Sequence, residues 1–497
     1  METLLARLDH TAAAMPARVA LQQRERQLDY RGLRDAASGF ARRLRAQGVA
    51  PGDRVAVVLP NCLEAAIAWY GSWCAGAAVV PLNAQARERD FVPWLRHSGP
   101  RVLVHATAHK DARLAALATG VPVLSLEPAA EPLEALTGAA DAETLPMPGP
   151  GALAAILYTS GTTGAPKGVA LSHRNLAANT ASILDYLQLT ATDSTVSALP
   201  FYYAYGASVL HTHLAAGARV VLEDNFVFPH LITETLARER ATGFSGVPST
   251  FALLLDRGQL DRHDLSALRY LTQAGGAMSP ALTRRLRAAL PRARLFVMYG
   301  QTEASARLTC LRPERLDDKL GSVGTPIAGV EIQVRREDGS PAATDEQGDV
   351  WARGDNVMTG YWHAPEATAA TLVDGWLRTG DLGHLDADGF LWLAGRRSDM
   401  IKTGAHRVHP QDVEEAIAEL PGVREVAVRG VDDPLLGQVV AAFIVRDDAL
   451  PTEMMVKAHC RQRLAAYKIP KTVAFVADLP RTASGKIRRA ALQEEIQ

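Results

Sequence analysis

A glycine-rich stretch that carries a lysine is the part of the sequence best suited to chemistry. It begins at Tyr158 and reads Tyr-Thr-Ser-Gly-Thr-Thr-Gly-Ala-Pro-Lys-Gly-Val. The glycines permit tight bends that expose backbone N–H groups, while hydroxyl side chains and the lysine add donors and a positive charge. The stretch therefore predicts a polyphosphate-binding loop. The residues that supply these groups are Thr159, Ser160, Gly161, Thr162, Thr163, Gly164 and Lys167.

The P-loop of kinases and NTPases is the first alternative for this stretch. It requires Gly, four residues, and then Gly-Lys-Ser/Thr, but here the second glycine is replaced by Pro166, and Gly168 follows the lysine. The apolar runs 153–157 and 169–171 predict a strand on each side of the loop, where a P-loop would open into a helix. A solvated Ser/Thr/Gly turn is the weaker alternative, because such turns rarely combine so many donors with a lysine.

Two further motifs follow predicted strands, where α/β sheets bind ligands. The first offers an aromatic ring, a hydroxyl and a carboxylate that could hold a magnesium ion. It consists of Tyr299, Gly300, Gln301, Thr302 and Glu303. The second consists of Gly275, Gly276 and Ala277, and its small side chains would let a flat ring approach the backbone.

Three single charged residues add to this set. Asp381, in Thr-Gly-Asp, supplies a carboxylate suited to the vicinal hydroxyls of a ribose, and Arg396 supplies a guanidinium for phosphate or ribose oxygens. Lys486 lies among other cations in a loop near the C-terminus. Each motif alone could be an ordinary turn or a solvated charge, but five in this order are hard to dismiss.

An aromatic cluster is a candidate ligand pocket, since the chain as a whole is only 6% aromatic. Its members, together with two glycines that could border the same pocket, are Phe201, Tyr202, Tyr203, Tyr205, Gly246 and Gly275. Core packing at the start of a helix is the alternative. His211 and His213 have the spacing of metal ligands, but no third ligand is evident nearby, so helix packing is favoured.

Composition and element order predict an α/β protein of more than one domain. A chain of 497 residues is too long for a single hydrophobic core. The net charge of −1 gives no reason to expect a nucleic-acid or membrane partner. Strand and helix patterns alternate as in parallel sheets covered by helices, and beyond about Gly321 short strands with Asp-Gly turns predict an antiparallel module. We expect a large domain at 1–396, a hinge at 397–399 and a small mobile α+β domain at 400–497.

The cysteines and the apolar segments predict the cellular compartment and whether the chain crosses a membrane. Four scattered cysteines without metal or redox spacing indicate free thiols in a reducing cytoplasm, and the N-terminus lacks the apolar run of a signal peptide. The segment 65–86 has no charged residue and could span a bilayer by length. A buried helix, a turn at Gly76 and a strand at 79–80 explain it better.

Taken together, the motifs resemble the adenylate-forming superfamily of acyl-CoA synthetases, nonribosomal-peptide adenylation domains and luciferases. The resemblance runs from about residue 20 to Arg489, with all motifs in the family's order. It implies that a carboxylic acid attacks ATP-magnesium to give an acyl-adenylate, and that a thiol then displaces AMP. By the same resemblance, Lys486 bridges the carboxylate and ATP, Glu303 ligates magnesium, and Asp381 holds the ribose, with Lys167 and Thr302 also at the reacting centre.

The resemblance also concerns the second step and its acceptor. It implies that the C-terminal domain rotates between steps and that Lys402 and Gly404 then face the thiol. The hinge position, usually Asp or Lys, is Ser398, and Tyr203 stands where acyl-CoA members often have His. Amino-acid-activating relatives commonly have an Asp in the segment 201–206, which here has none, so an acid without an α-ammonium is favoured.

Coenzyme A is the expected acceptor of the acyl group. A stand-alone adenylation enzyme that loads a carrier protein is the nearest alternative, and a luciferase-like oxygenase is a remote one. A binding protein without activity is the least favoured, because Lys167, Glu303, Asp381 and Lys486 are all present. The residues leave open which acid is activated and how many subunits assemble.

Overall fold

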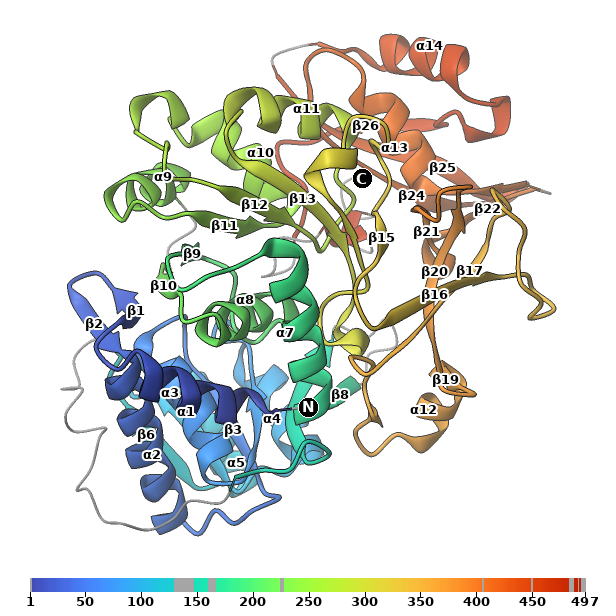
Figure 1. Ribbon diagram of the computed structural model, residues 1–497. Coiled ribbons are helices and arrows are strands. Elements are labelled where there is room, and N and C mark those ends of the chain that lie inside the picture. The colour runs from blue at the N-terminus through green and yellow to red at the C-terminus, as the bar shows by residue number, and fades with distance from the viewer. Residues whose placement is uncertain are drawn as a thin grey trace.

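The computed structural model describes residues 2–128, 147–159, 167–223, 228–404, 406–447, 450–481, 487–489 and 491–492. This described part contains four sheets: two large sheets with helices on their faces, an antiparallel module, and a sheet in a small C-terminal unit (Figure 1). The predicted α/β class, with its antiparallel module and its small α+β unit, is confirmed.

The first large sheet has seven strands in the order β18-β8-β7-β4-β3-β5-β6. The strands are β3 (Arg54–Val58), β4 (Ala78–Pro81), β5 (Val102–Ala106), β6 (Val123–Leu126), β7 (Leu153–Thr159), β8 (Lys167–Ser172) and β18 (Gly360–Tyr361). The connecting helices are α3 (Leu63–Cys74), α4 (Glu88–Ser98) and α5 (Lys110–Thr119). Because helices carry the chain back across the sheet, β4, β3, β5 and β6 pair in parallel.

The uncharged segment 65–86 forms most of α3, a turn and β4. All residues of α3 are buried, Gly76 has φ +80° at the turn, and the next strand lies inside the sheet. Burial on all sides explains the lack of charge, as predicted. In the part of the chain that the structure describes, no helix is both long enough and apolar enough to cross a bilayer.

The second large sheet has nine strands in the order β15-β14-β13-β12-β11-β9-β10-β1-β2. The strands are β1 (Val19–Gln23), β2 (Arg26–Asp29), β9 (Ser194–Ser197), β10 (Arg219–Leu222), β11 (Gly243–Gly246), β12 (Tyr270–Gln273), β13 (Arg294–Tyr299), β14 (Thr309–Leu311) and β15 (Thr325–Pro326). From β9 to β13 the neighbours pair in parallel, and every strand predicted there is present.

Helices separate and cover the two large sheets. The helices not yet given are α1 (Leu4–Ala14), α2 (Tyr30–Ala46), α7 (His173–Leu187), α8 (Ala204–Ala215), α9 (Pro229–Arg238), α10 (Pro248–Arg257) and α11 (Pro280–Ala289). The largest core joins α3, α7 and α8 to strands of both sheets, while α4 and α5 cover the outer face of one sheet and α9 to α11 that of the other. This layering places α7 and α8 between the sheets (Figure 1).

The antiparallel module follows the second sheet and contains strands that the sequence does not predict. Its strands are β16 (Val330–Arg335), β17 (Gly348–Gly354), β19 (Leu372–Val373), β20 (Trp376–Leu385) and β21 (Leu391–Arg396), and α12 (Pro365–Thr371) precedes β19. The sequence prediction missed β20, which pairs with both β17 and β21. Gly380, at φ +77°, lies where the register between β17 and β20 shifts, so the regular alternation of this strand is interrupted.

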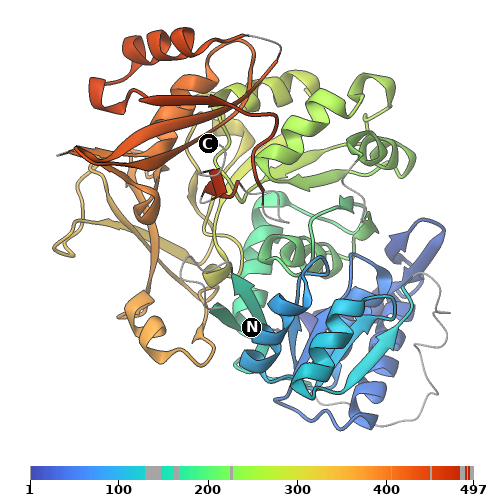
Figure 2. The ribbon, with the colours of Figure 1, turned by 180° about the vertical axis from the view of Figure 1, so that it is seen from behind.

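The C-terminal unit has its own sheet and core. Its elements are β22 (Ile401–Thr403), β23 (His406–Val408), β24 (Val423–Asp433), β25 (Gly437–Arg446), β26 (Thr472–Phe475), α13 (Pro410–Ala418) and α14 (Glu453–Arg463). Seen from behind, this unit in orange and red lies beside the antiparallel module, which is drawn in yellow and light orange (Figure 2). A short 3-10 turn, Arg397–Asp399, connects β21 to β22, and the division of the chain at this turn stays a prediction.

Other differences from the sequence prediction concern short or edge elements. The chain also forms α1, β2, β14, β15, β18, β19, β22, β23 and β26, which the hydrophobic pattern did not reveal, and 3-10 turns at Leu260–Arg262, Thr302–Ala304, Pro313–Arg315 and Ala466–Lys468. The hydrophobic pattern predicts strands at 121–124 and 196–199, and the corresponding β6 and β9 are each displaced by about two residues from these ranges. The four cysteines are buried and unpaired.

Candidate active site

Strands β7 and β8 form an antiparallel hairpin that presents the glycine-rich stretch. Thr159 pairs with Lys167 at the end where the connecting residues 160–166 join the two strands, and Tyr158 pairs with Gly168. A Cβ at Gly168 would lie 2.8 Å from Ile156 Cγ2, so the close approach of the two strands favours glycine. The two flanking strands predicted from the sequence are confirmed. Five of the predicted phosphate-binding residues, Ser160, Gly161, Thr162, Thr163 and Gly164, lie outside the described residues.

Three predicted nucleotide-binding residues meet where the second sheet joins the antiparallel module. Tyr299 ends β13, and its hydroxyl donates to Asp381 Oδ2 at 2.6 Å. Arg396 lies opposite Asp381 in the β20–β21 ladder, with its Nε 3.3 Å from Asp381 Oδ1. Burial raises the pKa of Asp381, and the Arg396 charge and the Tyr299 hydroxyl oppose this effect. The carboxylate is therefore fixed beside an exposed guanidinium, an arrangement suited to ribose hydroxyls.

An Asp381→Asn substitution is expected to weaken ATP binding roughly 10- to 100-fold, because a charged acceptor is lost. It should nevertheless raise the melting temperature at pH 7. A folded pKa above the unfolded value of 3.8 means that Asp381 stabilises the fold less as pH rises through that pKa. The gain should therefore shrink as pH falls through the folded pKa of Asp381 and should be lost below the unfolded value of 3.8. Nucleotide titration and thermal unfolding at several pH values measure both effects.

Arg396→Gln is the matched control for this prediction. It removes the guanidinium and leaves the Asp381 carboxylate, which is only 6% exposed, without its ion-pair partner. The melting temperature at pH 7 should then fall, opposite in sign to Asp381→Asn. If both variants shifted the melting temperature in the same direction, the buried carboxylate would not be the source of the effect.

Tyr361 links two other predicted residues and was not selected from the sequence. Its hydroxyl donates to Glu303 Oε1 at 2.9 Å, and Lys167 Nζ lies 5.6 Å from the centre of its ring. The strand β18, which contains Tyr361, pairs with β8, which begins at Lys167. The structure thus gathers the lysine and the carboxylate on one aromatic side chain.

The surroundings of Glu303 fit a magnesium ion. Within the described residues, Glu303 Oε2 takes part in no hydrogen bond or ion pair, so one carboxylate oxygen is open to a ligand. No group of three His, Cys, Asp or Glu side chains there could hold a metal ion by itself. Magnesium is commonly bound by one or two carboxylates together with substrate phosphates and water, which matches this donor set.

Backbone geometry supports the two glycine-containing motifs. A Cβ at Gly300 would lie 2.1 Å from Ala306 O, so only glycine fits the turn between Tyr299 and the half-buried side chains of Gln301 and Thr302. Gly275 has φ +84°, which favours glycine. Next to it, Gly276 and Ala277 form an exposed surface without large side chains, where a flat ring could lie.

The predicted aromatic cluster divides into buried and half-buried rings. Phe201 is buried, and the Tyr205 hydroxyl donates to Thr272 O at 2.8 Å. Tyr202 and Tyr203 lie at the start of α8 with ring centres 4.5 Å apart. A Cβ at Gly246 would lie 2.7 Å from Thr250 Cγ2, so this glycine allows α10 to approach β11. The role of the cluster and its glycines in an acid pocket stays a prediction.

The residues predicted for the second step belong to the hinge turn and the C-terminal unit. Lys402 is exposed on β22, and Gly404, at φ +56°, donates its N–H to Leu436 O at 2.8 Å. Ser398 is exposed in the turn between β21 and β22. Lys486 lies outside the described residues, so its position relative to the other groups stays a prediction.

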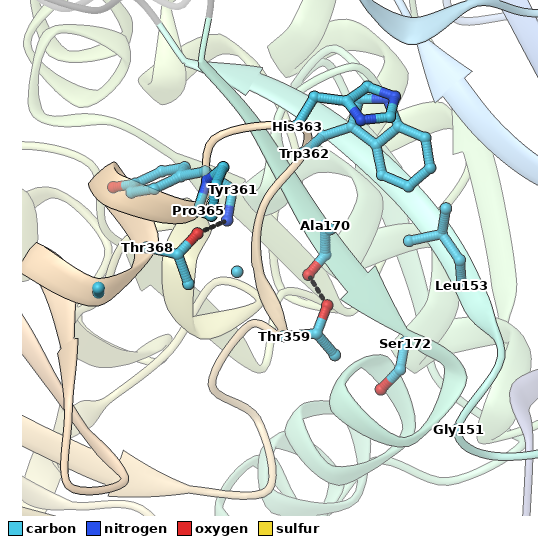
Figure 3. A pocket seen from close by; sticks show the side chains of 12 residues that line it. Gly151, Leu153, Ala170, Ser172, Thr359, Tyr361, Trp362, His363, Pro365 and Thr368 are labelled. Carbon is cyan, nitrogen blue, oxygen red and sulfur yellow. Dashed lines mark hydrogen bonds between the residues drawn. The ribbon is translucent and has the colours of Figure 1, made fainter.

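A surface hollow of about 600 Å³ lies next to Tyr361 (Figure 3). Its walls include Tyr361, Trp362, His363 and Pro365, and none of the predicted site residues that the structure describes lines it. Two hydrogen bonds hold its walls together: Thr359 Oγ1 donates to Ala170 O at 3.0 Å, and the Tyr361 N–H donates to Thr368 Oγ1 at 2.8 Å. The hollow therefore borders the segment that positions Tyr361 against Glu303.

Comparisons with known proteins show the family to which the chain belongs. The family model of the AMP-binding enzymes matches residues 8–362, and that of the AMP-binding enzyme C-terminal domain matches 412–486. A feruloyl-CoA synthase from Amycolatopsis sp. is 36% identical over 488 residues, covering 97% of this chain and 96% of that enzyme. A 2-succinylbenzoate–CoA ligase from Bacillus velezensis is 34% identical, with the same coverage.

Solved structures show the same fold. ATP-bound MatB from Rhodopseudomonas palustris has a TM-score of 0.92 at 32% identity, and the match covers 99% of this chain and 98% of that chain. The o-succinylbenzoate CoA synthetase from Bacillus subtilis, in complex with its acyl-adenylate intermediate, has a TM-score of 0.88 at 30% identity, with the same coverage. The chain thus belongs to the AMP-binding enzymes, the adenylate-forming superfamily, and is an AMP-forming acid–thiol ligase of the acyl-CoA synthetase type.

Proposed function

We propose that this enzyme joins a carboxylic acid without an α-ammonium to coenzyme A in two steps at one site. The observation that carries the assignment of roles is the convergence of Tyr299, Asp381 and Arg396 at one end of the site. At the other end, Tyr361 brings Lys167 and Glu303 together. The first group suits a ribose and the second a polyphosphate with its metal ion.

In the first step, ATP is oriented for attack on its α-phosphorus. The adenine lies on the surface formed by Gly275, Gly276 and Ala277, and Asp381 accepts hydrogen bonds from the ribose hydroxyls. The glycine-rich stretch and Lys167 hold the phosphates, and Glu303 holds magnesium, which neutralises phosphate charge when bound. A carboxylate oxygen of the acid forms a bond to the α-phosphorus, and the bond to the β-phosphate oxygen breaks, so pyrophosphate leaves.

No protein nucleophile is needed for this displacement. The reaction depends on alignment of the carboxylate with the leaving pyrophosphate and on cancellation of the developing negative charge. Lys486 supplies a positive charge between the acid and ATP, and Thr302 directly precedes Glu303 in the 3-10 turn Thr302–Ala304. These roles follow from the positions of the motifs in the family's order.

In the second step, a thiol attacks the acyl carbon of the adenylate. The carbon–sulfur bond forms, the bond to the phosphate oxygen breaks, AMP leaves, and the thiol proton passes to solvent. We propose that the C-terminal domain, 400–497, turns about 397–399 relative to 1–396, so that Lys402 and Gly404 face the thiol. Gly404 would leave space for a pantetheine arm beside the backbone.

The test is a screen of ATP–pyrophosphate exchange over aryl, short, medium and long acyl acids and amino acids, with mass spectrometry of the products. Activation of at least one acid and formation of its CoA thioester are expected. Transfer only to a carrier-protein phosphopantetheine would replace coenzyme A as the acceptor, and light emission or oxygen consumption would indicate oxygenase chemistry. We also place the enzyme in the cytoplasm, on the basis of its four unpaired thiols.

Glu303→Gln is expected to raise the magnesium concentration for half-maximal adenylation roughly 10-fold, because a neutral amide replaces the carboxylate. The reaction rate is measured as magnesium is titrated at fixed ATP. Tyr361→Phe is the matched control, since it removes only the hydrogen bond to Glu303 Oε1. Its effect should be smaller. Identical titrations for Glu303→Gln and wild type would remove Glu303 from the metal site.

A further inference from the structure

A small enclosed cavity lies between α3, α7 and α8, apart from the surface hollow beside Tyr361. The cavity volume open to the centre of a water molecule is about 10 Å³. Polar side chains from three helices line it: Trp69 from α3, Asn179 from α7, and Ser208 and His211 from α8. The cavity therefore has room for one small group, and its walls are not purely apolar.

Three polar atoms of these walls have no hydrogen-bond partner among the described residues. They are Trp69 Nε1, His211 Nε2 and Asn179 Oδ1, and each of the three residues is at most 2% exposed. In two of these side chains, the second polar atom has a partner. His211 Nδ1 lies 3.1 Å from the Tyr70 hydroxyl, and Asn179 Nδ2 donates to Arg307 O at 3.2 Å. An unpaired buried polar atom is costly, so three in one cavity indicate a ligand group.

The hydrogen-bonding character of these atoms identifies the group. Tyr70 is buried, and His211 Nδ1 is the acceptor within reach of its hydroxyl, so the phenol donates and the histidine carries its proton on Nε2. Trp69 Nε1 and His211 Nε2 are then two donors, and Asn179 Oδ1 is one acceptor. A hydroxyl accepts two hydrogen bonds and donates one, and so satisfies all three.

Charged groups are poor candidates for this cavity. Among the described residues, no Asp, Glu, Lys or Arg lines it. Burial lowers the pKa of His211 to about 3, so the imidazole is neutral at physiological pH. A carboxylate, sulfonate or ammonium would therefore lack a counter-charge, and its desolvation would be costly.

The cavity touches the segments that form the reaction site. Leu157 lies two residues before Thr159, Ser305 lies two residues after Glu303, and Ala204 lies between Tyr203 and Tyr205. On α8 the lining residues have helical spacing, at positions 204, 207, 208 and 211. The small side chains of Ala204 and Ala207 leave room for the cavity, and His211 is the last of these lining residues along α8.

We propose that this cavity is the closed end of the acid pocket, and that the preferred acid carries an uncharged hydroxyl at the end remote from its carboxylate. This inference rests on the proposed acid-activating function and adds the substrate class. Trp69, Asn179 and His211 are specificity-determining residues that contact the hydroxyl, while the reacting carboxylate is held elsewhere.

The test compares acids that differ in one group. The pairs are para-hydroxy and para-methyl aryl acids, and ω-hydroxy and ω-methyl alkanoic acids of equal length. The kcat/KM of pyrophosphate release should favour the hydroxy acid of the matching length by at least about 100-fold, because the methyl compound leaves three buried polar atoms unpaired. His211→Phe should reduce this ratio to about 10 or less, and Trp69→Phe should lower it as well.

His213→Phe is the matched control. The Nδ1–H of this second buried histidine of α8 donates to Val209 O, and its Nε2 accepts from the Tyr270 hydroxyl. His213 does not line the cavity. It should leave the ratio unchanged. A ratio does not depend on the amount of folded enzyme, so loss of stability in His211→Phe would not imitate the expected result.

Each outcome bears on the proposal. Equal kcat/KM values for both members of every pair in wild type would mean that the cavity holds only a water molecule, and the inference would be wrong. A hydroxyl preference that survives in both His211→Phe and Trp69→Phe would also overturn it. Acids activated without a hydroxyl preference leave the proposed function intact, whereas no activation of any acid in the broad screen removes both.

Discussion

Lys486→Ala is expected to lower the rate of pyrophosphate release about 1,000-fold, the size of effect seen when one positioned charge or donor is removed from a transition state. Negative charge accumulates on the α-phosphate oxygens while the carboxylate attacks, and the lysine is the proposed cation between the two substrates. In the second step the acyl-adenylate already exists, and no anion approaches the phosphorus. Transfer from presynthesised acyl-adenylate to coenzyme A should therefore remain within about 10-fold of wild type.

Arg488→Ala is the matched control for the lysine. Arg488 is exposed in the same C-terminal segment, and its backbone N–H donates to Pro480 O at 2.7 Å. Loss of its side chain should leave both half-reactions close to wild type. Equal loss of both half-reactions in Lys486→Ala would contradict the assignment of the lysine to the first step alone.

The layered fold could be predicted from the sequence because its central strands are strongly apolar. The runs that form β3, β5, β7 and β13 are buried on both faces, so their hydrophobic pattern is visible without a structure. In contrast, β20 alternates buried and exposed residues around Gly380, and β14 and β15 are short strands at a sheet edge. Their pairing is fixed by tertiary neighbours, which local propensity does not report.

The site could be predicted from the sequence only where a motif is compact. Asp381 and Arg396 are selected as single residues and Tyr299 as part of another motif, and their contact depends on the β20–β21 ladder meeting the end of β13. Tyr361 was missed because its neighbours Lys167 and Glu303 are distant in sequence, although Gly-Tyr-Trp after a turn offered a weak signal.

The lining of the enclosed cavity was equally invisible in the sequence. Trp69 and Asn179 lie in two different buried helices, and neither belongs to a sequence motif. His211 was interpreted as a packing residue, and its buried ring contacts with Trp69 and Trp73 agree with that interpretation for one side of the imidazole. The unpaired Nε2 on its other side becomes apparent only when three helices are assembled.

The hinge prediction gains a physical basis from contacts on both sides of Ser398. Arg397 donates from Nε and Nη2 to the two carboxylate oxygens of the buried Asp349 on β17, each at 2.9 Å. On the other side, Asp399 Oδ2 lies 3.6 Å from Arg489 Nη1, and Arg489 also pairs with Glu414 on α13. One neighbour of Ser398 is thus tied to the antiparallel module and the other to the C-terminal unit.

Ser398→Pro is therefore expected to slow the complete reaction roughly 100-fold, because misplacing reacting groups by about 1 Å can lower a rate by that factor. Proline fixes φ at position 398 and also restricts Arg397, so rotation about this position is hindered. At least one half-reaction should stay near wild type, because the domain is held in one orientation rather than unfolded. The exposed Ser398 hydroxyl reaches only Asp399 Oδ1, at 3.1 Å among the described residues, so Ser398→Ala should run the complete cycle normally.

The measurement separates the two steps for each hinge variant. Pyrophosphate release reports adenylation, thioester formation from supplied acyl-adenylate reports transfer, and thioester formation from acid, ATP and coenzyme A reports the whole cycle. Ser398→Pro should be much slower in the third assay than in the faster of the first two. A wild-type rate for Ser398→Pro in the complete cycle would rule out rotation about Ser398 as part of the mechanism, since proline allows no free rotation about its own N–Cα bond.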